Sequence, residues 1–156
     1  MDNQQYKIAI CFFGLTRSLK HTYPSIEKNI FKVLKQHNID YDVFLHTYDL
    51  TSISNKRSGE FSCQLDTDEW KMLKPKSHII TNQQTFDNSF DWEMLYKHGD
   101  IWKDGYNSVR NAIRQLNSLK LVTSLWLKET PYDYYIYIRP DLYYVNEINV
   151  NDILNH

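Results

Sequence analysis

The sequence lacks the features that mark several classes of protein. Its 156 residues include only two cysteines, and these show no CxxC or Cys/His ligand spacing. Acidic and basic residues nearly balance, with a formal net charge of −1, and no run of Lys and Arg forms a basic patch. Because no overall field favours a polyanion or an anionic membrane, we expect no nucleic-acid partner.

Long apolar runs are also missing. The run Ile8 to Phe13 is too short for a signal-peptide core or a membrane span, and residues 1–5 contain no basic residue. We therefore expect no membrane span and a cytoplasmic location. Cys11 and Cys63 are expected to be reduced thiols, because the cytoplasm is a reducing compartment.

Several sequence motifs of nucleotide-binding, catalytic and zinc sites are absent as well. The chain has no GxGxxG loop and no Walker loop, which disfavours Rossmann dehydrogenases and P-loop NTPases. It has no GxSxG nucleophile elbow. The histidines lack HxxxH and HExxH spacing, so a zinc site is not expected.

What is present predicts one α/β domain over residues 1–156. Apolar runs typical of buried strands occupy residues 7–13, 41–46, 77–81 and 132–138. Helical patterns lie between them, so we expect a three-layer domain with a mainly parallel sheet.

The segments between the strands have distinct patterns. A helix is expected to open at Pro24 or Ser25, residues 51–59 are expected to form a mobile loop, and residues 66–73 a short helix. Residues 83–104 are expected to be irregular, with one helical turn near 92–97. The longest helix is expected over residues 106–128 and to be largely packed. Its apolar stripe comprises Val109, Ala112, Ile113, Leu116, Leu119, Val122 and Trp126.

Polar residues follow three of the predicted strands, at 14–17, 46–49 and 139–141. In an open α/β sheet, ligands bind beyond the carboxyl ends of the strands. Gly14 permits a tight turn and close approach of a ligand, and Arg17 is suited to pair with a diphosphate. The structural alternative is a strand-ending glycine beside a solvated arginine.

The tripeptide Arg139-Pro140-Asp141 is the most informative of these strand ends. Pro140 fixes the backbone just past a buried strand, and Asp141 offers an oxygen ligand for a divalent cation that bridges two phosphates. Arg139 would either pair with phosphate or orient Asp141. The alternative is a surface ion pair between Arg139 and Asp141 in a turn.

The long helix and the second strand supply further candidates. Asn111, Gln115 and Ser118 share one helix face. A second face carries Arg110, Arg114 and Asn117. His46 ends the second predicted strand and could donate to a phosphate or ribose oxygen, although a single histidine there is more often a hydrogen-bonded structural residue.

The segments 7–17, 41–47 and 132–142 together resemble a glycosyltransferase-like family found in large DNA viruses, algae and bacteria. The order of these segments along the chain and the spacing between them also match those of the family. The helix at 110–120 is also similar to a helix that precedes the Arg-Pro-Asp strand in that family. The resemblance spans residues 6 to about 145 and is weak between 51 and 104.

The resemblance implies a GT-A, Rossmann-like fold and transfer of a sugar from a nucleotide-diphosphate donor, with a UDP-sugar favoured, to a glycan or other acceptor. Manganese or magnesium is the implied cofactor, with Asp141 as its ligand, because Arg-Pro-Asp stands where other GT-A enzymes place Asp-x-Asp. The implied contacts to the donor nucleotide are Gly14, Thr16 and Arg17. Asn111 and Ser118 become donor-side candidates, with Arg110 and Arg114 as their rivals.

Two departures from the family leave alternatives open. Family members usually continue well beyond the Arg-Pro-Asp strand, whereas this chain ends at His156, and Arg-Pro-Asp has one acid fewer than Asp-x-Asp. A domain that binds nucleotide-sugar with weak or no turnover is the first alternative. The second is a non-catalytic interaction domain that uses the aromatic-rich segment 86–102.

Overall fold

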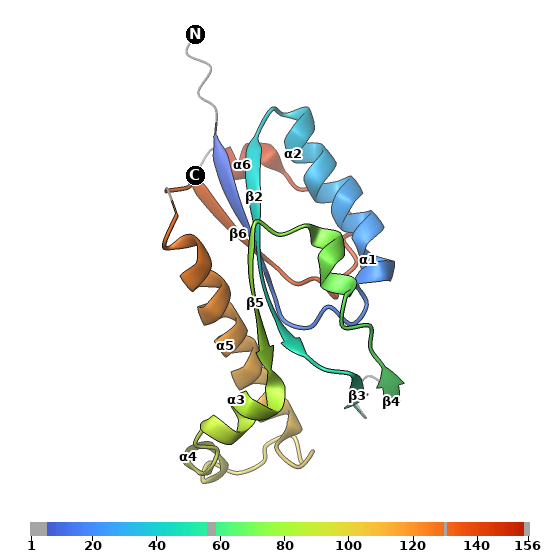
Figure 1. Cartoon of the computed structure of the whole chain (residues 1–156), viewed down its shortest axis with the longest axis vertical. Helices are drawn as coiled ribbons and strands as arrows, with labels where there is room; N and C mark the ends of the chain where they lie inside the picture. The colour runs from blue at the N-terminus through green and yellow to red at the C-terminus, as the bar shows by residue number, and fades with distance from the viewer. Residues whose placement is uncertain (1–5, 56–58, 130, 155–156) are drawn as a thin grey trace.

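Four parallel strands form the centre of the molecule (Figure 1). The computed structural model describes residues 6–55, 59–129 and 131–154. The strands are β1 (Lys7–Phe13), β2 (Asp40–Asp49), β5 (Ser77–Asn82) and β6 (Tyr134–Ile138), in the order β5-β2-β1-β6. Helices cover both faces of this sheet, as in a three-layer Rossmann-like fold, and the predicted α/β class is confirmed.

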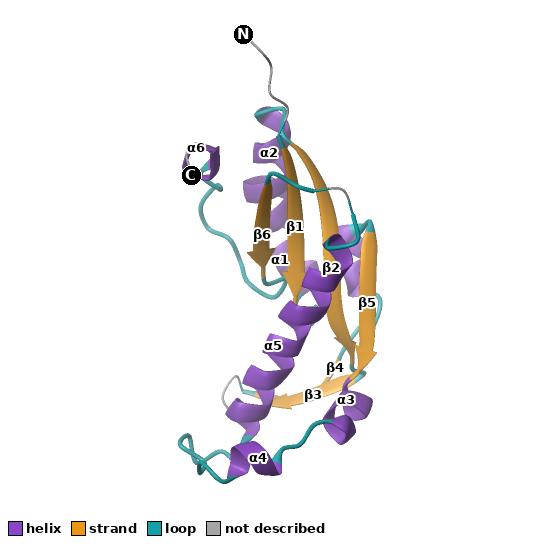
Figure 2. Cartoon of the chain, turned by 90° about the vertical axis from the view of Figure 1, so that its left-hand side faces the viewer, coloured by secondary structure: helices purple, strands orange, loops and turns teal. Residues whose placement is uncertain are grey.

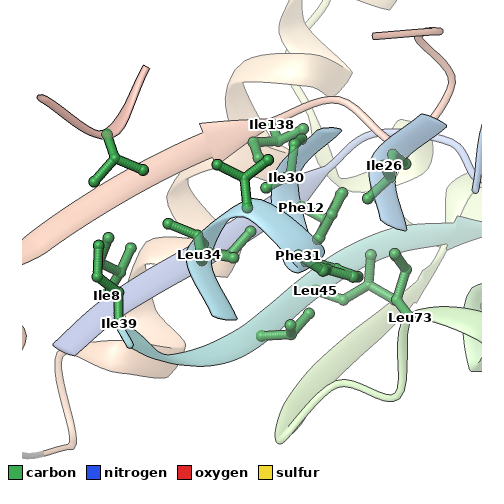
Figure 3. Packing of buried hydrophobic residues seen from close by; sticks show 14 of the residues in the cluster. Ile8, Phe12, Ile26, Ile30, Phe31, Leu34, Ile39, Leu45, Leu73 and Ile138 are labelled. Atoms are coloured by element: carbon green, nitrogen blue, oxygen red, sulfur yellow. The ribbon is translucent and has the colours of Figure 1, made fainter. Parts of the chain in front are cut away.

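One face of the sheet is covered by helical residues 19–36, which form α1 (Leu19–Ile26), the π-helical turn η1 (Glu27–Phe31) and α2 (Lys32–Gln36). Their apolar side chains interdigitate with those of β1, β2 and β6 to form the larger core (Figure 3). The predicted helix start at Pro24 or Ser25 is wrong. Pro24 lies inside α1, where packing of Leu19 and Ile26 outweighs the one backbone hydrogen bond that proline removes.

The opposite face of the sheet is covered by α5 (Asn107–Trp126). Successive side chains of a strand point to opposite faces. In β1, Ile8, Ile10 and Phe12 therefore join the larger core, whereas Ala9 and Cys11 join a smaller core that Val122 of α5 completes. The central strand is thus buried on both sides, which explains its continuous apolar run.

The helix α5 is not largely packed, contrary to the prediction. Only Ser118 and Val122 are buried in it, and Leu116 is 59% exposed. Figure 2 shows part of the reason: the amino-terminal half of α5 extends past the carboxyl ends of β1 and β6, so these two strands do not lie beneath it. That half is instead available to flank a ligand.

The segment predicted as a mobile loop contains strand structure. The strands β3 (Ser52–Asn55) and β4 (Glu60–Gln64) pair antiparallel, and residues 56–58 lie outside the described part of the chain. Cys63 lies exposed on β4. The remaining elements are the 3-10 turn η3 (Glu69–Leu73) and the short helices α3 (Gln83–Ser89), α4 (Glu93–Tyr96) and α6 (Val150–Leu154).

Candidate functional site

A cleft of about 1020 Å³ opens at the carboxyl ends of the strands. Its walls come from the loop after β1, the end of β2, the turn after β6, the amino-terminal half of α5 and the β3–β4 hairpin. In the sheet order β5-β2-β1-β6, β2 and β5 follow β1 on one side. The last strand, β6, lies on the other side of β1. The cleft therefore lies at the point where strand order reverses, the usual ligand site of such sheets.

The loop after β1 is shaped by Gly14. Its φ of +99° lies in the region that favours glycine, and its N–H donates to Ser118 Oγ at 2.8 Å. This bond connects the loop to α5. Leu15 and Arg17, which follow in the loop, line the cleft. Thr16 is buried and instead lines a neighbouring cavity of about 20 Å³.

The turn after β6 is anchored on the opposite side, against α1. Pro140 is fully buried, and its carbonyl accepts a hydrogen bond from Thr22 Oγ1 at 2.6 Å. The carbonyl of Arg139 accepts from Tyr144 Oη at 2.9 Å. With the backbone held at both residues, the side chains of Arg139 and Asp141 line the cleft.

These two side chains form a cluster with Arg17. Arg139 donates from Nε and Nη2 to the two oxygens of Asp141, at 2.9 and 2.7 Å, and from Nη1 to Gln115 Oε1 at 3.2 Å. Arg17 Nη2 lies 3.7 Å from Asp141 Oδ2. The hydrogen bonds to Asp141 raise the pKa of Arg139 above its ordinary value. The predicted Arg139–Asp141 pair therefore exists, but it faces a cleft and includes a second arginine.

The exposed half of α5 contributes the facing wall. Asn111, Arg114 and Gln115 line the cleft together with Asn107. Arg114 makes a bidentate ion pair with Asp87 of α3, at 2.9 and 2.6 Å, and donates to Asn111 Oδ1 at 2.9 Å. Arg114 thus braces α3 against α5, which fixes the width of the cleft on this side.

His46 lies behind the cleft and does not line it. It is fully buried in β2, with Nδ1 2.6 Å from Ser118 Oγ and Nε2 2.9 Å from Thr81 Oγ1. Burial lowers the pKa of His46 to about 4, so the imidazole is neutral near pH ~7. Ser118 is also fully buried and joins His46 to the backbone of Gly14. Both residues support the loop after β1 from below.

The structure thus divides the residues predicted from the sequence. It brings Gly14, Arg17, Asn111, Arg139 and Asp141 together in the cleft. It buries Thr16, His46 and Ser118 close by. Arg110 points elsewhere, since its Nε donates to the hydroxyl of Tyr96 and its guanidinium lies 5.4 Å from the centre of that ring.

Sequence reasoning missed one wall of the cleft. The β3–β4 hairpin contributes Ile53 and Phe61, and β2 and the residue after it contribute Tyr48 and Leu50. A signal was available: Ser52-Ile53-Ser54 and Phe61-Ser62-Cys63 alternate apolar and small polar residues on either side of Gly59, a pattern typical of a hairpin. Lys103, Asp104 and Gly105, also missed, complete the rim next to the start of α5.

The carboxylates of the cleft do not fit a divalent metal held by Asp141. The Asp141 side chain is only 6% exposed, and both its oxygens are hydrogen bonded to Arg139. Asp104 Oδ2 accepts from the backbone and hydroxyl of Ser108, at 3.0 and 2.6 Å, whereas Asp104 Oδ1 is buried without a hydrogen-bond partner among the described residues. Among the described residues, no group of three or more His, Cys, Asp or Glu side chains is placed to hold a metal.

Comparison of the chain with protein-family models, with curated proteins and with solved structures gave no significant match. Within the described residues, none of the helices is both long and apolar enough to cross a membrane.

Proposed function

We propose that the protein binds a nucleotide-diphosphate sugar, with a UDP-sugar favoured, in the cleft at the carboxyl ends of β1 and β6, and transfers the sugar to a glycan or other acceptor. The observation that carries this proposal is the position of Arg17 and Arg139. Both guanidinium groups line the cleft at the point where strand order reverses. The resemblance to a glycosyltransferase-like family supports the same function.

The composition of the cleft suits such a donor. Among the described residues, four basic side chains line it against two acidic ones, which favours a ligand with a net negative charge. The basic residues are Arg17, Lys103, Arg114 and Arg139. The apolar side chains of Tyr48, Ile53 and Phe61 offer flat or broad surfaces to a base or a sugar ring. The cleft volume of about 1020 Å³ is enough for a ligand of this size.

The chemistry that these residues support is stabilisation of a leaving group. When the bond between sugar and diphosphate breaks, negative charge develops on the diphosphate. Guanidinium donors already oriented at that point stabilise this charge without reorganising. Gly14 keeps the loop after β1 without a side chain, so the ligand can approach the backbone there. Manganese or magnesium, which the resemblance implies, has no step in this proposal because the Asp141 carboxylate is paired with Arg139.

Binding without turnover is the second candidate, and one observation favours it. Asp141, the carboxylate at the end of β6, has both oxygens hydrogen bonded to Arg139, so it is not set up to remove a proton from an acceptor. Under either candidate we place the protein in the cytoplasm, a proposal that the free thiols of Cys11 and Cys63 support.

Calorimetric titration with UDP and a panel of UDP-sugars tests the binding. We expect saturable binding, and a ligand at about a hundred times its Kd should raise the free energy of unfolding by about 2.7 kcal/mol. Release of UDP that depends on an added glycan acceptor separates the transferase from the binding domain. Absence of binding by every nucleotide-sugar in the panel would contradict both candidates.

A further inference from the structure

In the cluster of Arg17, Asp141 and Arg139, the two guanidinium groups are more exposed to the cleft than the carboxylate is. The side chain of Asp141 is 6% exposed, whereas those of Arg17 and Arg139 are 20% and 35% exposed. A ligand that enters the cleft therefore meets two guanidinium groups before it meets the carboxylate. This order is the reverse of what a metal-binding aspartate requires.

The guanidinium of Arg139 retains donors for a ligand. An arginine has five N–H groups, and the hydrogen bonds to Asp141 and Gln115 account for one each on Nε, Nη1 and Nη2. One N–H on Nη1 and one on Nη2 are thus not used by these partners. Two parallel N–H groups match two oxygens of a phosphate, the geometry that makes arginine a preferred phosphate ligand.

A divalent cation at Asp141 would face unfavourable electrostatics. It would have to displace the bidentate hydrogen bonds of Arg139 and would lie within a few ångströms of two fixed positive charges. Like charges at such distances repel strongly in a partly buried site. The two arginines already supply the positive charge that a metal supplies when it bridges donor phosphates.

We propose that Arg17 and Arg139 bind the diphosphate of the donor directly, without a divalent metal, and that Asp141 is a positioning residue that orients both guanidinium groups. This inference rests on the proposed function, since it describes how the same cleft binds the same donor. It assigns Asp141 a role different from the metal ligand that the family resemblance implies.

The test is calorimetric titration of the full chain with UDP and with inorganic pyrophosphate, in excess EDTA and in excess manganese. We expect the same affinity in both conditions. Arg17→Gln and Arg139→Gln should each weaken UDP binding about tenfold to a hundredfold, because each removes charge-assisted hydrogen bonds. Lys120→Gln is the charge-matched control: Lys120 is exposed on α5 outside the cleft, and its replacement should leave the affinity unchanged.

Two further variants examine the carboxylates. Asp141→Asn should still bind UDP in EDTA, and the Nε–H signal of Arg139 in its NMR spectrum should shift because its charged partner is lost. Asp104→Asn should also bind UDP in EDTA. Circular dichroism of each variant establishes that it is folded. The comparison of UDP affinity in EDTA and in manganese uses the unchanged chain and so does not depend on the folding of any variant.

The outcomes distinguish this inference from the proposed function. If UDP binds only with manganese, and Asp141→Asn or Asp104→Asn abolishes that binding, direct binding by the arginines is wrong while the proposed function stands. If neither UDP nor any UDP-sugar binds in either condition, the proposed function itself is wrong. Binding in EDTA that depends on Arg17 and Arg139 supports both.

Discussion

Replacing Ser118 with alanine should lower the free energy of unfolding by about 2–5 kcal/mol, because the change leaves the buried imidazole of His46 and the half-buried N–H of Gly14 without this partner. Ser118 Oγ accepts from the N–H of Gly14 at 2.8 Å and lies 2.6 Å from His46 Nδ1. Both bonds lie behind the loop that leads to Arg17. We therefore also expect weaker UDP binding, since the loop loses its connection to α5.

Urea denaturation measures the first effect and calorimetry the second. Ser124→Ala is the matched control on the same helix, because within the described residues Ser124 Oγ makes a single, local hydrogen bond, to the carbonyl of Leu121 at 2.7 Å. Its replacement should change stability by less than about 0.5 kcal/mol. Equal stability losses in the two variants would show that the buried Ser118 network contributes nothing special.

Acidification should destabilise the protein by up to about 3 kcal/mol as the pH falls from about 6.5 to about 4, through His46 alone. Burial lowers the pKa of His46 from its ordinary value of 6.5 to about 4. Between these two pH values, the unfolded chain therefore binds a proton at His46 that the folded chain does not bind. The stability that neutral His46 allows is fully present above the unfolded-state pKa and is lost as the pH falls toward the folded-state value.

Urea denaturation at a series of pH values measures this effect. His46→Gln should be less stable near neutral pH but should lose most of the dependence on pH in this window. His37→Gln, which changes an exposed histidine of the turn after α2, should keep the full dependence. An unchanged pH profile in His46→Gln would show that another group causes the destabilisation.

The parts of the fold predicted best from the sequence are those whose local pattern is sufficient by itself. β1 occupies residues 7–13 as expected, because a strand buried on both faces must be apolar throughout. The three strand ends that meet at the cleft were likewise predictable, since parallel strands place their carboxyl ends at one edge of the sheet. The sequence thus placed Gly14, Arg17, Arg139 and Asp141 in one site.

The parts predicted worst depend on contacts between distant segments. His46 looked like a strand end, but β2 continues to Asp49, so His46 lies inside the sheet opposite Phe13 and Ile79. The apolar stripe of α5 could not show that half of the helix projects past the ends of β1 and β6. The aromatic residues Phe86, Phe90 and Trp92 pack on one another, which sequence spacing alone does not reveal.

The pairing of Asp141 is another contact of this kind. From the sequence, Arg139 was expected to bind phosphate, to orient Asp141, or to form a surface ion pair with it. In the structure, hydrogen bonds from Thr22 and Tyr144 hold the backbone of the turn, and both side chains line the same cleft as Arg17. A motif of three residues does not contain that information.

A crystal structure of the protein with a bound UDP-sugar tests the central claim most directly. The proposed function predicts the diphosphate at the carboxyl ends of β1 and β6, within hydrogen-bond distance of the guanidinium groups of Arg17 and Arg139. A nucleotide bound outside this cleft, or a diphosphate turned away from both arginines, would contradict it.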